Sequence, residues 1–182
     1  MFQDALALIS ILLTELKRLD DKMALLEVQL LESRVYFAIK NLAKSKAALT
    51  AARTVANSVY CPPLIQAGLD MQSGFIHAEE RDFKTAYSYF FEALDAFTSQ
   101  EDSRALSTLK YMLLCKIMLN QVSSQIMKAD EVHNIILNKL AVNHSSNRHI
   151  LAMVDVAKAY QSRSLKALEK TLHDFNEGLK ES

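Results

Sequence analysis

Helix-breaking residues are scarce along the whole chain. Its 182 residues include only three glycines and two prolines, and the two prolines stand together as Pro62–Pro63. An all-β fold needs many tight turns, which Gly and Pro normally supply, so this composition favours helices. Half of the residues are hydrophobic, which is enough for one substantial core, arranged as one domain or as a short array of repeats.

Apolar residues recur at helical spacing throughout the sequence. The pattern predicts helices over residues 2–18, 22–40, 42–58, 64–80, 83–98, 103–119, 128–142, 147–160 and 164–180. No convincing strand pattern occurs, and no linker divides the chain, so residues 1–182 are predicted to form a single array. Because short connections force consecutive helices to pack antiparallel, we expect helical hairpins.

These hairpins are predicted to repeat. Aligning Ala47 with Ala86 gives an offset of 39 (86 minus 47), and the two segments share a pattern of apolar positions rather than residue identity. A period of roughly 40 residues that contains two helices is typical of a tetratricopeptide-like or related α-solenoid.

Small residues and one aromatic residue predict where the helices of a hairpin approach each other. The residues assigned to this packing are Gly74, Ala86, Phe90 and Ala93. Their spacing resembles the tetratricopeptide pattern, although Asp70 and His77 stand where that pattern usually has Trp and Tyr in its first helix.

Two helices are predicted to be unusually apolar. Segment 103–119 is apolar around most of its circumference, so we expect it to be buried on several sides and to be the most sequestered helix of the chain. In segment 2–18, Leu8, Ile11 and Leu12 widen the apolar surface beyond a single stripe.

The sequence offers no strong catalytic or metal-binding signature. No P-loop, Rossmann, HExxH, GxSxG or CxxC motif occurs. Cys115 is interpreted as a buried small hydrophobe and Cys61 as a loop thiol that should react faster. His144 and His149 flank a polar loop that is a poor template for metal coordination. We therefore predict no catalytic residue, no cofactor and no metal.

The overall charge balance argues against some classes of partner. Lys plus Arg equals Asp plus Glu, at 21 each, so bulk charge favours neither a nucleic-acid partner nor a membrane. A modest basic face formed by Lys40, Lys44 and Arg53 is a candidate docking patch for a protein, next to the alternative of a solvated helix face. The two cysteines suit a reducing compartment, and the N-terminal segment lacks the basic region of a signal peptide.

Two long stretches make the chain similar to a known family. The sequence "YCPPLIQAGLDMQSGFIHAEE" and the later "ALSTLKYMLLCKIMLN" resemble PCI-domain subunits of the lid of the 26S proteasome regulatory particle. The similarity is dense over 22–120, weakens through 121–160 and returns at 162–175.

The resemblance implies a right-handed α-solenoid that acts as a non-catalytic scaffold in ubiquitin-dependent protein degradation. Its implied partners are other lid subunits, the ATPase ring and core-particle subunits, and its implied location is the cytoplasm and nucleus. In this family a winged helix follows the solenoid; here we expect only the solenoid portion of a longer PCI protein, with the winged helix absent.

Other interpretations stay open at this point. A PCI subunit of the COP9 signalosome type and a generic tetratricopeptide adaptor belong to the same structural class. The "YCPP" and "LKYMLLCKIMLN" stretches favour the proteasome over both. A cysteine-dependent enzyme is the alternative from another class, and thiol alkylation of any measured activity would distinguish it.

Overall fold

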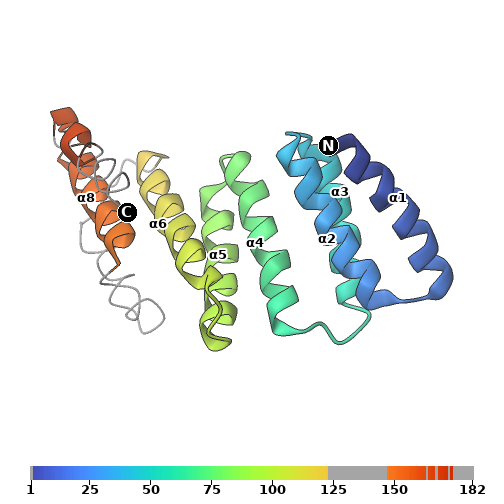
Figure 1. Cartoon of the computed structure of the whole chain (residues 1–182). Helices are drawn as coiled ribbons and strands as arrows, with labels where there is room; N and C mark the ends of the chain where they lie inside the picture. The colour runs from blue at the N-terminus through green and yellow to red at the C-terminus, as the bar shows by residue number, and fades with distance from the viewer. Residues whose placement is uncertain (1, 123–146, 163, 167, 172, 174–182) are drawn as a thin grey trace. The chain divides into compact units, whose positions relative to one another are not determined.

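The structure is a computed structural model, and it describes residues 2–122, 147–162, 164–166, 168–171 and 173. Its helices are α1 (Phe2–Leu19), α2 (Lys22–Ala38), α3 (Leu42–Ala56), α4 (Pro63–Glu79), α5 (Phe83–Ser99), α6 (Arg104–Val122) and α8 (Arg148–Gln161) (Figure 1). The described residues contain no strand, and the predicted all-α fold is confirmed. The predicted helix 128–142 lies outside the described residues, as does part of 164–180.

The chain divides into two compact units, Met1–Asp102 and Ser103–Ser182. In the first unit, α2 packs against α3 and α4 packs against α5, which makes two helical hairpins, and α1 packs against α2. In the second unit, α6 packs against α8. None of the described helices is long and apolar enough to cross a membrane.

Side chains at the helix starts explain where the helices begin. The carboxylates of Asp21 and Asp82 and the amide oxygen of Asn41 each accept a backbone N–H bond from the third residue after them. Such caps satisfy N–H groups that have no partner inside the helix. The hydrogen bonds from Thr85 also lower the pKa of Asp82. As predicted, Pro63 occupies the first turn of α4, where no N–H is needed.

The helix starts set the length of the repeat. Helices α2, α4 and α6 begin at Lys22, Pro63 and Arg104, so the spacing between successive starts is 41 in both cases. Helices α3 and α5 begin at the same spacing. A two-helix repeat of roughly 40 residues is therefore present, but the offset of 39 is wrong. Ala86 corresponds to Ser45 rather than to Ala47, because position relative to the helix start decides equivalence and residue identity does not.

Small residues let the helices of the first hairpin approach closely. The Ser33 hydroxyl lies 2.9 Å from the Ser45 carbonyl oxygen, and the Ser45 hydroxyl lies 2.9 Å from the Ser33 carbonyl oxygen. Both serines are fully buried. Burying a hydroxyl is costly unless it is hydrogen-bonded, and these contacts supply the partners. A cluster of Leu26, Leu30, Leu49, Ala52, Ala56, Leu69 and Ile76 forms the core beside this contact.

The second hairpin uses the equivalent positions with different residues. Gly74 corresponds to Ser33, and a Cβ atom at Gly74 would lie 2.7 Å from Cε1 of Phe90. Ala86, Phe90 and Ala93 are buried. The ring of Phe75 meets Phe90 edge to face, with 5.4 Å between the ring centroids. Of the four residues assigned to hairpin packing, Gly74 and Phe90 lie against each other, and Ala86 and Ala93 are buried in α5.

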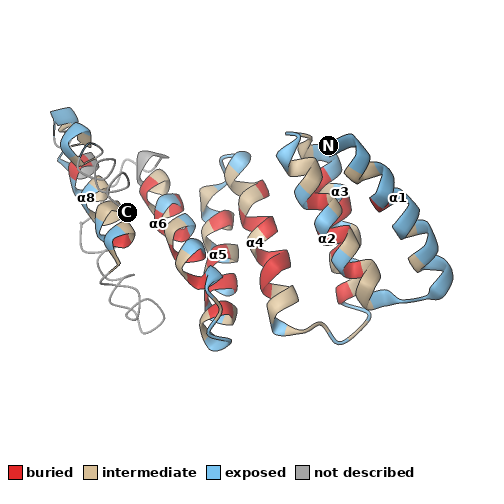
Figure 2. Cartoon of the chain, in the orientation of Figure 1, coloured by how far each residue is buried: buried red, intermediate tan, exposed pale blue. Residues whose placement is uncertain are grey.

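Among the described helices, α4 has the largest number of buried residues, and α6 follows it closely with seven buried residues between Ala105 and Ile117. The expectation that 103–119 is buried on several sides is therefore confirmed, whereas the expectation that it is the most sequestered helix is wrong. Eight of the 17 residues of α4 are buried, because α4 packs against α2, α3 and α5 (Figure 2). In α6, Tyr111 and Leu114 are 40% and 44% exposed, so one side of this helix is less covered than the rest. Composition reveals how apolar a helix is, but not which of its sides have neighbours.

Helix α1 presents the broad apolar surface that its sequence predicts. Ile9 is buried, whereas Leu8 and Ile11 are 63% and 62% exposed. The helix packs on α2, and Figure 2 shows most of α1 coloured as exposed.

The two glycines of α4 should respond oppositely to alanine. Gly74→Ala should lower the free energy of unfolding by about 1–3 kcal/mol, because Phe90 is enclosed and cannot yield to the new methyl group. Gly68→Ala should be neutral or stabilising by up to about 1 kcal/mol, because alanine favours helix. Its new Cβ would meet only the ends of the Arg34 and Leu30 side chains, at 3.3 Å. Urea unfolding of both variants tests this, and equal losses would contradict the close contact at Gly74.

Candidate docking site

The structure places the three predicted docking residues in different surroundings. Lys40 Nζ lies 3.1 Å from Glu79 Oε1 in an exposed ion pair. Lys44 Nζ lies 5.3 Å from the centre of the Tyr36 ring. Arg53 is partly buried and contacts other residues of the same unit. Of the three, Lys44 lines the groove described below.

Arg53 is the centre of a cluster that joins three helices. Its Nη2 atom donates to Asp70 Oδ1 and to Ser73 Oγ, at 2.7 Å in both cases. Its guanidinium carbon lies 5.0 Å from the centre of the Tyr89 ring. Gln66 Nε2 donates to the other carboxylate oxygen of Asp70 at 3.1 Å. The cluster therefore connects α3 to α4 and α5 and supplies hydrogen bonds to a buried carboxylate.

His77 lies beside this cluster. Its ring stacks on Tyr89 with 5.5 Å between centroids and an interplanar angle of 15°. Asp70 and His77 are the two departures from the tetratricopeptide pattern. Asp70 accepts a hydrogen bond from Arg53, His77 stacks on Tyr89, and Arg53 lies over the Tyr89 ring, so both departures belong to one cluster. These polar contacts occupy positions that the tetratricopeptide pattern fills with large aromatic residues.

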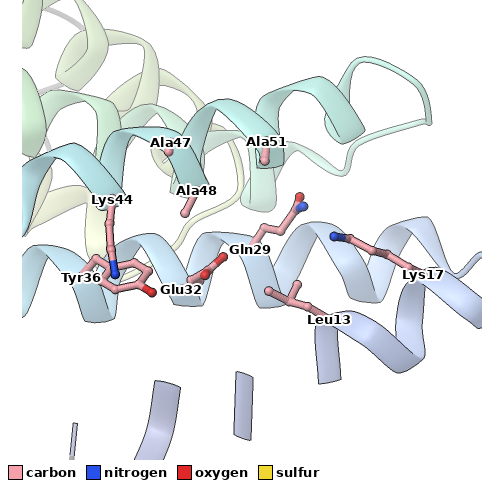
Figure 3. A pocket seen from close by; sticks show the side chains of 9 residues that line it. All are labelled: Leu13, Lys17, Gln29, Glu32, Tyr36, Lys44, Ala47, Ala48 and Ala51. Carbon is pink, nitrogen blue, oxygen red and sulfur yellow. The ribbon is translucent and has the colours of Figure 1, made fainter. Parts of the chain in front are cut away.

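A groove of about 350 Å3 opens where α1, α2 and α3 meet (Figure 3). We call it the α1–α3 groove, and its lining residues are Leu13, Lys17, Gln29, Glu32, Tyr36, Lys44, Ala47, Ala48 and Ala51. Helix α2 contributes Gln29, Glu32 and Tyr36 to the lining of the groove. Helix α3 contributes three alanines, whose short side chains leave space.

Hydrogen-bond acceptors line the α1–α3 groove along α2. Gln29 is 7% exposed, and its Oε1 has no hydrogen-bond partner among the described residues. Partial burial raises the pKa of Glu32, and the charges of Lys17 and Lys44 oppose this rise. An acceptor that is buried without a partner costs free energy.

Neither cysteine has the character of a nucleophile. Burial raises the pKa of Cys61, and the nearby charge of Asp70 adds to the rise. Cys115 is 4% exposed, and burial raises its pKa to about 11. A reactive cysteine needs a lowered pKa, so neither thiol is activated.

One of the two histidines that flank the predicted polar loop is described. His149 lies in the first turn of α8, within the predicted helix 147–160, and its backbone N–H donates to Asn147 Oδ1 at 3.0 Å. His144 lies outside the described residues. Within the part of the chain that the structure describes, no group of three or more His, Cys, Asp or Glu side chains could hold a metal ion.

Sequence patterns alone did not predict Gln29 and Glu32 as residues of the site. Each looks like an ordinary polar residue of an amphipathic helix. The signal lies in the register set by the helix starts, which pairs Gln29 with Asp70 and Glu32 with Ser73. The offset of 39 conceals this pairing.

The chain is similar over nearly its whole length to proteins with proteasome names. It is 54% identical over 175 residues to the Schizosaccharomyces pombe protein named "Probable 26S proteasome regulatory subunit rpn6", covering 96% of this chain and 40% of that protein. It is 48% identical over 178 residues to "26S proteasome non-ATPase regulatory subunit 11" of Dictyostelium discoideum, covering 98% of this chain and 41% of that protein. The Saccharomyces cerevisiae "26S proteasome regulatory subunit RPN6" is 49% identical over 184 residues, with 99% and 39% covered.

The chain therefore spans about 40% of the length of the curated relatives that it matches. No protein-family model matches it.

Removing the Arg53 guanidinium should destabilise the first unit. Arg53→Met should lower the free energy of unfolding by about 1–3 kcal/mol, because the buried Asp70 carboxylate then loses a charged donor. The control Lys40→Met breaks the exposed pair with Glu79 and should cost less than about 1 kcal/mol. Adding Asp70→Asn to Arg53→Met should cost less than the sum of the two single changes. Urea unfolding of the wild type and the four variants tests this, and strictly additive losses would show that the pair is not coupled.

The two thiols should label at different rates under native conditions. Cys61 should react faster with a maleimide than Cys115, because it is less buried. Labelling of Cys115 should rise about tenfold per pH unit from pH 7 to pH 9, since its pKa of about 11 lies above this window. Peptide mapping by mass spectrometry reads both rates. Preferential native labelling of Cys115 would mean that α6 exposes this thiol.

Proposed function

Because this chain is a homologue of the non-ATPase regulatory subunit 11 proteins of the 26S proteasome over nearly its whole length, we propose that it acts as a non-catalytic scaffold of the regulatory-particle lid. In this role it supports assembly and stability of the complex in ubiquitin-dependent protein degradation. The observation that carries the proposal is sequence identity of 48–54% across at least 96% of the chain.

The described structure is suited to a scaffold. Stacked hairpins present extended surfaces to partners, which is how helical repeat proteins bind. Both cysteines have raised rather than lowered pKa values, which agrees with the names "non-ATPase" and "regulatory" among the relatives. We propose that the chain is not an enzyme and that it needs no cofactor.

The proposal extends to partners and location. The partners are other lid subunits, the ATPase ring and subunits of the core particle, and the protein works in the cytoplasm and nucleus without binding nucleic acid or membrane. We further propose that residues 1–182 form a single solenoid array. Lys44, which lines the α1–α3 groove, is the residue of the predicted basic face best placed to meet a partner.

Affinity purification from the cells that make the protein tests this function. A chromosomally tagged gene product should co-purify named regulatory-particle subunits in fixed stoichiometry, measured by quantitative mass spectrometry against an untagged strain. Recovery of signalosome subunits instead would favour the COP9-type alternative. Recovery of neither complex would overturn the proposal, and a generic tetratricopeptide adaptor would then be the better interpretation.

A further inference from the structure

Exposed apolar side chains concentrate on α1 (Figure 2). Of the twelve large hydrophobic side chains that are exposed among the described residues, five lie in this one helix: Phe2, Leu8, Ile11, Leu12 and Leu19. A helix that is apolar on more than one side normally has more than one neighbour. Helix α1 packs on α2 through other residues, such as the buried Ile9, and leaves these five side chains in solvent.

The exposed face of α1 has a seven-residue repeat. Seven residues are close to two turns of an α-helix, so positions that are seven apart lie along the same side of it. We call this face the α1 stripe, and its residues, all exposed, are Asp4, Leu8, Ile11, Leu12, Glu15, Arg18 and Leu19. Its centre is apolar, and charged residues stand toward both ends. An exposed stripe of this kind is typical of a surface that binds another protein.

The charges of the α1 stripe are complementary to those of a second α1 that runs in the opposite direction. Asp4 lies seven residues before Ile11, and Arg18 lies seven residues after it. In an antiparallel pair with Ile11 at the twofold axis, Asp4 of each copy therefore comes to the level of Arg18 of the other copy. A parallel pair would instead place like charges opposite each other at both ends, which is unfavourable.

We infer that the α1 stripe is an interface through which two copies of this chain pair, with their α1 helices antiparallel and Ile11 at the twofold axis. Leu8 and Leu12 lie close to Ile11 on the stripe, so pairing removes the most apolar part of it from water. The two copies use the same patch, as is usual for a twofold homodimer. Antiparallel pairing also brings the positive end of each helix dipole near the negative end of the other.

The arginine of the stripe has donors for both contacts. Arg18 Nη1 lies 3.2 Å from Glu15 Oε1 of its own helix, in an exposed pair. A guanidinium carries five N–H donors, so that it can also serve Asp4 of the second copy. Because a single pair of helices makes a small interface, the dimer should be weak, with a dissociation constant on the order of 10 μM.

Sedimentation velocity of the 182-residue chain, from about 1 to 300 μM, tests the inference. The sedimentation coefficient should rise with concentration from that of a monomer to that of a dimer and no further. The double variant Leu8→Gln with Ile11→Gln should weaken dimerisation by about tenfold or more, because amides replace apolar groups at the axis. The control Leu31→Gln with Leu151→Gln makes the same changes at exposed leucines of α2 and α8 and should leave it unchanged.

Charge reversal tests the antiparallel arrangement. Asp4→Lys and Arg18→Glu should each weaken dimerisation by about threefold to tenfold, since each places like charges opposite each other at both ends. An equimolar mixture of the two variants should recover the affinity of the wild type, because opposite charges then meet at both ends of the mixed pair. In a parallel pair neither variant alone would weaken dimerisation, since like charges already meet in the wild type. Circular dichroism checks that both variants keep their helix content.

Three results would overturn the inference. They are a chain that stays monomeric at every concentration, equal weakening in the two double glutamine variants, and no recovery when the charge variants are mixed. The inference does not depend on the proposed scaffold role, because dimerisation is measured on the purified chain and co-purification is measured from cells.

Discussion

The close approach of the two helices in each hairpin is the constraint on which the first unit depends. Two helices can approach this closely only where residues at the crossing are small. The first hairpin uses Ser33 and Ser45, whose hydroxyls bond to each other's backbone. The second uses Gly74, against which the Phe90 ring lies. The crossing falls at the same position relative to the helix starts in both hairpins, so it sets the register in which all other side chains meet.

That shared register makes the differences between hairpins informative. In one hairpin Arg53 satisfies a buried carboxylate and contacts an aromatic ring, so the position between neighbouring helices is filled and rigid. In the other, leucine and alanine leave a groove with a buried amide oxygen that lacks a partner among the described residues. Unpaired buried acceptors are costly, so the two hairpins differ in how well their polar side chains are satisfied.

Charge alone would not reveal this arrangement. The chain has equal numbers of acidic and basic residues, and exposed pairs such as Lys40–Glu79 and Lys46–Glu80 contribute little stability. The partly buried Arg53–Asp70 pair contributes more, because solvent screens it less. What matters is which charges lie at a helix contact, and this depends on packing rather than on composition.

Local physics determined much of this protein from sequence. Helical periodicity, capping residues and Pro63 predicted most described helices to within a few residues, because helix formation depends on neighbours along the chain. The resemblance to proteasome lid subunits also followed from sequence, since it depends on residue identity. Only the tertiary structure decided the true register of the repeat and the burial of α4 on most of its sides. It also decided that Arg53 pairs with Asp70, while Gln29 Oε1 has no partner in the described part of the chain. These properties depend on which helices are neighbours in space and on their offset, and a small error in that offset pairs the wrong side chains.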